Sequence, residues 1–276
     1  MAIKNLSKNH PVAFFALIYA ISAPFWIIGA HMQNSGLPDN IPVTDIGATL
    51  SPAIAACILI YRENGRTGLK VFLGRVFDHH RASSRAWFLT AILLLPALYG
   101  ITYFVMRAMG FPIPAELQIS SSLLGALLIF LIAAMVEELG YSAYATDALQ
   151  TRHSAFSTAL LVGVPWAFWH LSSMLQMGQS WPLIVWGLLA TIAFRVITVW
   201  LYNNNNCSLL VVILAHAIGT TARSAFPGGR RAYELGDGAV SYTIIILTAV
   251  CVTLLWGPKS LKNFLGRHLM SGRAKV

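Results

Sequence analysis

The chain has 276 residues, of which 57% are hydrophobic and only 11% are charged. A typical soluble domain has about 25% charged and about 45–50% apolar residues, so this composition excludes an ordinary soluble enzyme and a disordered chain. The formal net charge of +9 does not indicate a nucleic-acid partner, because the positive residues are distributed as in a membrane protein. The 3 cysteines are too few for a disulfide framework or a CxxC metal site.

In chain order, the sequence contains eight apolar segments that approach or reach the ~20 residues needed to cross a bilayer as a helix. They are residues 12–30, 45–61, 87–106, 121–149, 155–176, 182–202, 208–226 and 240–256. A transmembrane β-barrel is excluded because its strands alternate apolar and polar residues over ~10 positions. We therefore predict an all-α polytopic membrane protein, a bundle of about eight transmembrane helices that forms a single domain over residues 1–276.

The positive residues predict the orientation of the chain. Most of the 19 Lys and Arg residues lie on one side of the membrane if the N-terminus is cytoplasmic, and many of them are in the long connection 62–86. Cytoplasmic loops carry the excess of Lys and Arg in membrane proteins. We expect both termini to be cytoplasmic, and the small size with short loops favours a bacterial inner membrane.

Ionisable residues inside the predicted spans are the candidates for function. They are Glu137 and Glu138 on the fourth span, His170 on the fifth, Arg195 on the sixth and His216 on the seventh. A charge at the centre of a membrane helix costs about 2.5–3.5 kcal/mol on insertion scales, so such residues usually face the interior of the bundle. A rise of about 1.5 Å per residue places Glu137, His170 and His216 at similar depth. The adjacent glutamates point about 100° apart on a helix, which favours different roles for them.

This set of side chains suits the hydrolysis of a peptide bond. A carboxylate and a histidine that converge in a dry site can hold and deprotonate a water molecule, directly or through a metal. A second histidine can bind the metal or donate a hydrogen bond to an oxyanion. The alternative interpretation is a polar cluster that only holds the helices together.

The same residues occur in three ordered motifs. Residues 137–142 read EELGYS, where the pattern EExxxR has an arginine at the last position; Trp166 stands four residues before His170; and His216 is followed four residues later by Thr220. In order and spacing, these motifs over about residues 120–222 resemble the CPBP group of CAAX protease and bacteriocin-processing membrane proteins. This group includes the Ras-converting type of CAAX endopeptidase.

The resemblance implies an intramembrane endopeptidase with a membrane-bound protein or peptide substrate, prenylated or not, and the lipid bilayer as its surroundings. By matching positions, Glu137 would activate the water and His170 would be its partner or a metal ligand. His216 would be a second ligand or an oxyanion donor, and Thr220 would stand where the family has Asn or Asp. Glu138 completes the predicted catalytic set. If zinc is the cofactor, its ligands would be Glu137, His170 and His216.

Two positions depart from the motifs. Ser142 replaces the arginine that would share a helix face with Glu138 and neutralise it. We expect Arg195 to pair with Glu138 instead, or with Asp147; the alternative is that Arg195 extends to the membrane boundary. Thr220 keeps one hydroxyl donor but lacks the two donors and the carbonyl of an amide.

Three functions therefore compete. The leading prediction is the endopeptidase, which requires Glu137, His170 and His216 to converge. The second is a catalytically silent family member that binds and regulates another membrane protein, which Ser142 and Thr220 favour. The third is a small transporter that uses Glu and His as a proton relay, but the inverted repeats or broken helix pairs of such proteins are not clear in the sequence.

Overall fold

The computed structural model describes residues 10–32, 47–117 and 122–262, and within these ranges the chain is helical with no strand. The elements are α1 (Pro11–His31), α3 (Ser51–Gly74), η1 (Arg75–Phe77), η2 (His79–Arg81), α4 (Arg85–Ala108), α5 (Ser122–Glu138), η3 (Leu139–Thr146), α6 (Asp147–Gln150), α7 (Ala155–Gln176), α8 (Trp181–Asn204), α9 (Leu209–Ser224), α10 (Gly229–Tyr233) and α11 (Ala239–Trp256). η1 and η2 are single 3₁₀ turns, whereas η3 is a π-helix.

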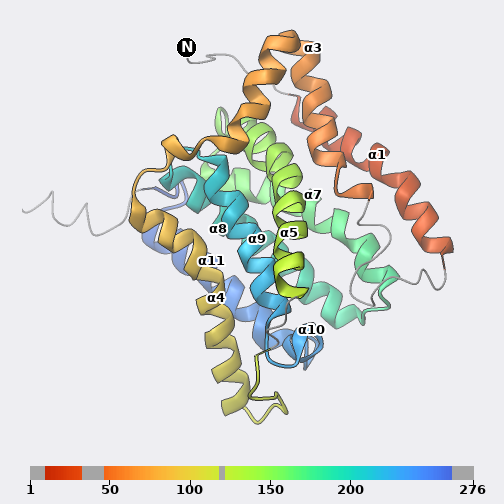
Figure 1. The fold of residues 1–276 in the computed structure, drawn as a ribbon, viewed down its shortest axis with the longest axis vertical. Coiled ribbons are helices and arrows are strands. Elements are labelled where there is room, and N and C mark those ends of the chain that lie inside the picture. The colour runs from red at the N-terminus through yellow and green to blue at the C-terminus, as the bar shows by residue number, and fades with distance from the viewer. Residues whose placement is uncertain (1–9, 33–46, 118–121, 263–276) are drawn as a thin grey trace, which may run out of the picture.

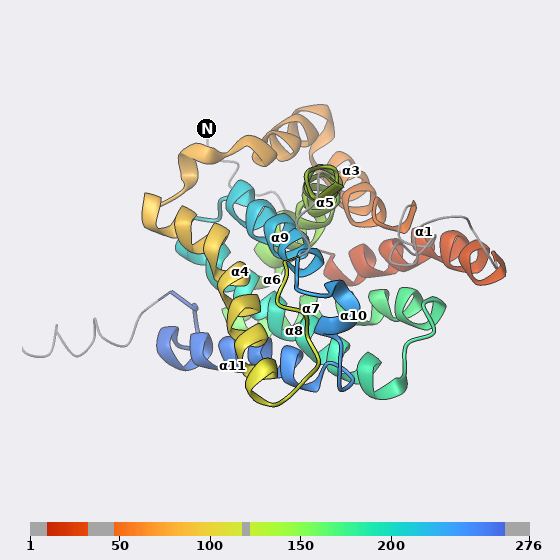
Figure 2. The ribbon, with the colours of Figure 1, turned by 60° about the horizontal axis from the view of Figure 1, so that its bottom comes forward.

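The helices form a bundle with α8 and α9 in its middle (Figure 1). α7 packs against α8, α8 packs against α11, and α9 packs against both α4 and α5. From below, α5, α7, α8 and α9 gather near the centre, with α4 and α11 on one side and α1 on the other (Figure 2). The four central helices are those that carry the ionisable residues singled out in the sequence.

Six helical segments in the described part of the chain are long and apolar enough to cross a membrane. They are α1, α4, the continuous segment Ser122–Gln150, α7, α8 and α11. Large apolar side chains such as Leu89, Phe104 and Ile132 point away from the bundle and are exposed. An extensive apolar surface of this kind marks contact with lipid. The prediction of an all-α polytopic membrane protein is confirmed, while the side of the membrane on which the termini lie stays a prediction.

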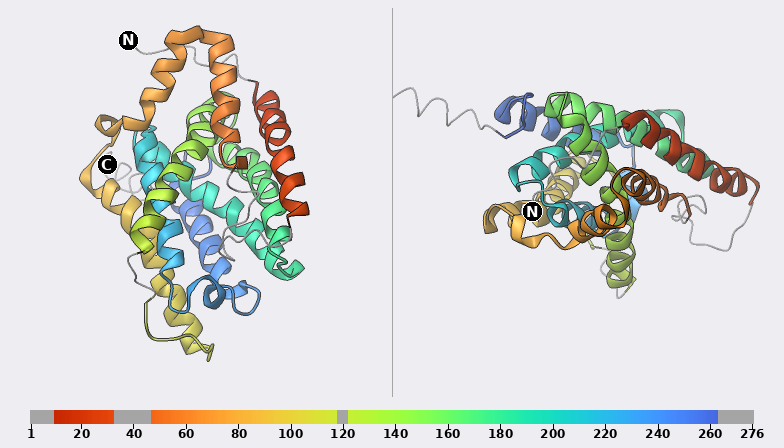
Figure 3. Two further views of the ribbon diagram at one scale, coloured as in Figure 1. Left: turned by 45° about the vertical axis from the view of Figure 1, so that its right-hand side comes forward. Right: turned by 90° about the horizontal axis from the view of Figure 1, so that it is seen from above.

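Two of the eight predicted spans are not among these six membrane-spanning helices. The span 45–61 becomes α3, which turns sharply at Gly65 (φ 62°, ψ −162°), so that its two halves form an arch above the rest of the bundle (Figure 3). The span 208–226 becomes α9, which has only 16 residues. α9 is packed between α4, α5 and α8, and a helix enclosed by neighbouring helices does not need the full thickness of the bilayer.

Serine side chains define the start of three of the long helices. The hydroxyls of Ser84, Ser154 and Ser180 accept hydrogen bonds from backbone N–H groups in the first turns of α4, α7 and α8. Each cap satisfies a donor that the helix itself cannot pair, and such a cap stabilises a helix by about 1 kcal/mol. These caps set where α7 and α8, which carry His170 and Arg195, begin.

Candidate active site at the centre of the bundle

The glutamate pair lies where the winding of its helix changes. α5 ends at Glu138, and the π-helix η3 follows directly. In η3 the hydroxyl of Thr146 donates to the carbonyl of Tyr141, five residues earlier, over 2.8 Å. Single π-helical segments inside α-helices occur frequently at functional sites. The local winding therefore marks the same place as the sequence motif.

Gly140 allows α3 to pack directly against η3. A Cβ atom at this position would lie 2.6 Å from both the Cβ and the carbonyl oxygen of Pro52. Because side-chain atoms do not approach backbone so closely, only glycine fits between the two elements. This contact holds the start of α3 against the segment that follows the glutamates.

Glu138 is completely buried, and its carboxylate is fully used by neighbouring donors. Arg195 donates from one terminal nitrogen to Oε2 over 2.8 Å and from the other to Oε1 over 3.3 Å. The hydroxyl of Ser142 donates to Oε2, and Nδ1 of His216 lies 3.0 Å from Oε1. Since a carboxylate only accepts hydrogen bonds, Nδ1 of His216 carries the proton in this contact. Glu138 therefore fixes the orientation of the His216 ring.

The structure decides between the alternatives for Arg195. Arg195 pairs with Glu138, which confirms the first alternative, and its side chain has no exposed area. The extension of Arg195 to the membrane boundary is therefore wrong. Asp147 instead binds Arg75 over 2.7 Å and accepts a hydrogen bond from the hydroxyl of Tyr202 over 2.8 Å.

Glu137 has different surroundings from Glu138. Among the described residues it accepts one hydrogen bond, from the indole nitrogen of Trp166 to Oε2 over 3.0 Å. Glu137 also keeps 6% exposure, whereas Glu138 has none. The two adjacent carboxylates thus differ in their partners, as their positions around the helix suggest.

Trp166 connects the helices of the candidate site. Its ring centroid lies 5.4 Å from that of His170 and 5.7 Å from that of His216. The guanidinium of Arg195 lies over the same ring, 4.2 Å from its centroid. Residues of α5, α7, α8 and α9 therefore meet around one indole ring. The sequence predicted an aromatic residue of the second motif here, but not its hydrogen bond to Glu137.

His170 and Thr220 are both partly buried. The ring of His170 packs against Trp169 as well as Trp166. The hydroxyl of Thr220 donates to the carbonyl of His216 over 3.1 Å. Because a hydroxyl has a single hydrogen to donate, an oxyanion would compete with this bond inside α9. The roles of both residues stay predictions.

The predicted zinc ligands do not gather into a metal site. Within residues 10–32, 47–117 and 122–262, no group of three or more His, Cys, Asp and Glu side chains could hold a metal ion. Glu137, His170 and His216 all belong to these ranges. A catalytic zinc needs three protein ligands and an open position, so the residues do not fit zinc in this arrangement.

Arg75, which the sequence analysis did not single out, supports the C-terminal end of the helical segment that carries the two glutamates. It donates to the carboxylate of Asp147, to the carbonyl of Ala143 over 2.9 Å and to the hydroxyl of Tyr202. Burial alone would lower the pKa of Arg75, but Tyr202 and Asp147 raise this pKa above its ordinary value. Arg75 therefore stays charged and joins η3 to α8.

Asp78 is a second support that the sequence analysis missed. Its carboxylate accepts hydrogen bonds from the backbone N–H groups of Leu209 and Leu210 and from the hydroxyl of Ser208. A negative charge at a helix N-terminus satisfies free N–H groups and is favoured by the helix dipole. Asp78 thus fixes the start of α9, the helix of His216. The signal available in the sequence was an acidic residue within a connection rich in Lys and Arg.

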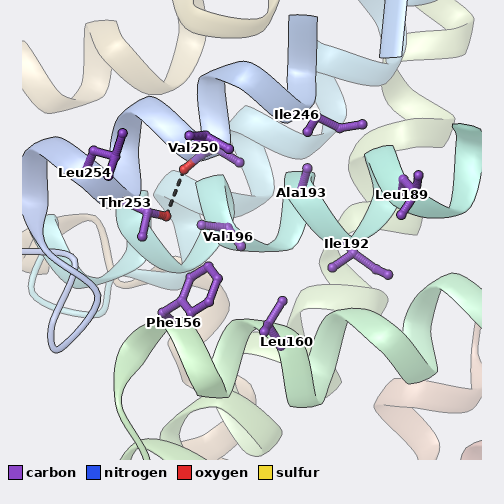
Figure 4. A pocket seen from close by; sticks show the side chains of 11 residues that line it. Phe156, Leu160, Leu189, Ile192, Ala193, Val196, Ile246, Val250, Thr253 and Leu254 are labelled. Carbon is purple, nitrogen blue, oxygen red and sulfur yellow. Dashed lines mark hydrogen bonds between the residues drawn. The ribbon is translucent and has the colours of Figure 1, made fainter. Parts of the chain in front are cut away.

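An apolar pocket of about 300 Å³ lies between α7, α8 and α11 (Figure 4). Its walls are aliphatic and aromatic, and the hydroxyl of Thr253 is already bonded to the carbonyl of Ala249. None of the predicted site residues lines it. The pocket offers no polar chemistry, and we do not count it as part of the site.

Comparison with known proteins agrees with this geometry. A family model described as type II CAAX prenyl endopeptidase Rce1-like matches residues 119–222. The CAAX prenyl protease 2 of Methanococcus maripaludis is 25% identical over 224 residues, which cover 76% of this chain and 82% of that protein. The matched segment contains the glutamate pair, both histidines and Arg195. Over this segment the chain is therefore similar to the type II CAAX prenyl endopeptidases.

Proposed function

We propose that this chain is an intramembrane endopeptidase that hydrolyses a peptide bond with a water molecule activated by Glu137. The observation that carries the proposal is the contrast between the two adjacent glutamates. Glu138 is enclosed and saturated by Arg195, Ser142 and His216. Glu137 is oriented through one oxygen by Trp166 and keeps some exposure. A general base needs a lone pair that other donors do not occupy.

In the proposed reaction, the oxygen of the water forms a bond to the carbonyl carbon of the substrate, and Glu137 accepts the proton. The carbonyl oxygen carries the negative charge of the tetrahedral intermediate. The carbon–nitrogen bond then breaks, and Glu137 returns the proton to the leaving nitrogen. The reaction consumes one water molecule and one peptide bond, and it leaves Glu137 in its starting state.

The histidines hold the water and polarise the carbonyl in this proposal. His216 is fixed through Nδ1 by Glu138, which directs its other nitrogen away from that carboxylate. A buried carboxylate that orients a histidine in this way is a recurring device of hydrolytic enzymes. The ring of His170 packs against Trp166, which also contacts His216.

The proposed substrate is a membrane-anchored peptide with a prenylated C-terminal CAAX sequence. The name of the similar archaeal protein supports this class, and a peptide precursor without a prenyl group is the alternative. The bacterial inner membrane stays a prediction, because the similar protein belongs to an archaeon.

Cleavage of a defined peptide by the purified chain in liposomes tests the proposal. We expect the wild-type protein to release the C-terminal fragment of a farnesylated CAAX peptide. Glu137→Gln removes the base with little change in shape, and we expect the rate to fall by about 10²–10⁴-fold. Glu116→Gln makes the same change at an exposed position and is the matched control. Equal rates for Glu137→Gln and Glu116→Gln would contradict the proposal.

A catalytically silent family member is the second candidate. The observation that favours it is the hydroxyl of Thr220, which is already bonded within α9. This alternative predicts that Glu137→Gln leaves the cellular role of the protein intact, whereas loss of that role supports the endopeptidase.

A further inference from the structure

We propose that Arg195 is the positioning residue of this site, and that it stands on α8 in place of the arginine that the first motif has at position 142. Ser142 is the companion change that makes room for it. The catalytic part of this inference rests on the proposed function, whereas the exchange of positions can be tested without activity.

Arg195 and position 142 share one space beside Glu138. The hydroxyl of Ser142 bonds to the same carboxylate oxygen as Arg195 and lies 3.4 Å from the guanidinium. A longer side chain that starts at position 142 would enter the volume that this guanidinium occupies. Two guanidinium groups beside one buried carboxylate would leave a positive charge without a partner, which is costly inside a membrane protein. The site therefore accepts one arginine, from either helix.

α7 leaves room for the stem of Arg195. A Cβ atom at Gly163 would lie 3.1 Å from the Cβ of Arg195 and 3.3 Å from the Cα of Ile192. The backbone of α7 thus packs closely against α8 at this level. A larger residue at position 163 would therefore press on the first atoms of the Arg195 side chain.

Arg195 also acts on Glu137 through Trp166. Its guanidinium lies 4.2 Å from the centroid of the Trp166 ring, within the range of a cation–π interaction. The indole N–H of that ring donates to Glu137. One side chain on α8 therefore contacts Glu138 directly and holds the donor that orients Glu137.

The same contacts extend to His216. The carboxylate of Glu138 accepts hydrogen bonds from Arg195 on both oxygens and from His216 on Oε1. Loss of Arg195 would leave the buried carboxylate free to turn, and the ring of His216 would lose its fixed partner. Arg195 touches neither the water nor the substrate in the proposed reaction, so it acts by positioning the groups that do.

Moving the arginine back to position 142 tests the inference. The proteins are the wild type, Arg195→Ser, Ser142→Arg and the double variant Ser142→Arg with Arg195→Ser. Each is assayed in liposomes for kcat and KM with the farnesylated peptide, and in detergent for the midpoint of thermal unfolding. Arg107→Ser, which removes an arginine bonded to the carbonyl of Ile113, is the control for the loss of a positive charge.

We expect both single variants to lower kcat by about 100-fold, because small displacements of catalytic groups have effects of this size. The double variant should recover kcat to within about tenfold of the wild type and should recover the unfolding midpoint. KM should change much less than kcat, since the substrate contacts remain. Arg195→Lys should be intermediate, because lysine keeps the charge but lacks the planar fork that binds both oxygens and stacks on Trp166.

The outcomes separate the two proposals. A double variant that is no better than the worse single variant, in both kcat and unfolding midpoint, would overturn the exchange. If the wild type cleaves nothing, the proposed function fails, and the unfolding midpoints alone decide the exchange: recovery in the double variant supports it, and no recovery overturns it.

Discussion

Replacing Trp166 by phenylalanine removes the hydrogen bond to Glu137 and keeps an aromatic ring between the two histidines. The indole nitrogen lies 3.0 Å from Oε2 of Glu137, and Trp166 is almost completely buried. Phenylalanine preserves the ring contact with Arg195 but has no N–H group. We expect Glu137 to lose its fixed orientation in this variant.

The size of the effect follows from the strength of the bond. A hydrogen bond to a charged group contributes about 1.5–3 kcal/mol, and about 1.4 kcal/mol corresponds to a factor of ten in rate. If the bond holds Glu137 in its reactive orientation, kcat should fall by about 10- to 150-fold. KM should change little, because the substrate contacts are not altered.

Trp169→Phe is a closely matched control. Trp169 lies on the same helix, is 1% exposed and donates its indole N–H to the hydroxyl of Ser22 over 2.8 Å. This variant loses the same atoms and one indole hydrogen bond, but not a bond to Glu137. The assay measures kcat and KM in liposomes together with the unfolding midpoint of each variant. We expect similar losses of stability but a much smaller loss of kcat in Trp169→Phe.

Two results would refute this reasoning. The first is an unchanged kcat in Trp166→Phe, which would mean that the indole N–H does not orient the base. The second is an equal loss of kcat in both variants, which would mean that the effect comes from packing in α7 rather than from the bond to Glu137.

Two further predictions concern the packing that supports the site and the dependence of activity on metal ions. Gly140→Ala should lower the free energy of unfolding by about 1–3 kcal/mol, because the new Cβ would collide with Pro52. Gly125→Ala, which has open space around it, is the control and should be nearly neutral. Thermal unfolding measures both variants, and equal effects would contradict the close packing of α3 on η3. Peptide cleavage should persist after a chelator removes zinc, because the three predicted zinc ligands do not gather in the described part of the chain. A loss of cleavage that added zinc alone restores would contradict this prediction and would show that the ligands converge in the working enzyme.

The helical architecture and the candidate residues could be predicted from the sequence because both depend on local signals. Apolar segments of spanning length mark membrane helices, and ionisable residues inside them are rare enough to be noticed one by one. Pairing of Arg195 with Glu138 was one of three alternatives that the sequence left open. In the structure Arg75 pairs with Asp147 and Arg195 pairs with Glu138, and the spacing along the chain does not specify which arginine meets which carboxylate.

Features that depend on tertiary packing could not be predicted. The π-helix η3 and the contact of Gly140 with Pro52 depend on how α3 meets the Glu-bearing helix. The packing of α9 against α4, α5 and α8 likewise depends on helices that are distant in the sequence. The bond from Trp166 to Glu137 depends on the direction of two side chains from different helices, which spacing along one chain does not specify.

Protein termini in the membranes of living cells provide the most direct test that this chain is a protease whose base is Glu137. Membranes from cells that carry the wild-type protein are compared with membranes from cells that carry Glu137→Gln at matched expression. The account predicts specific new termini only where Glu137 is present, and the cleaved chain then identifies the substrate. Identical termini in both membranes, together with a cellular defect when the whole protein is deleted, would contradict the account and would favour a binding role without catalysis.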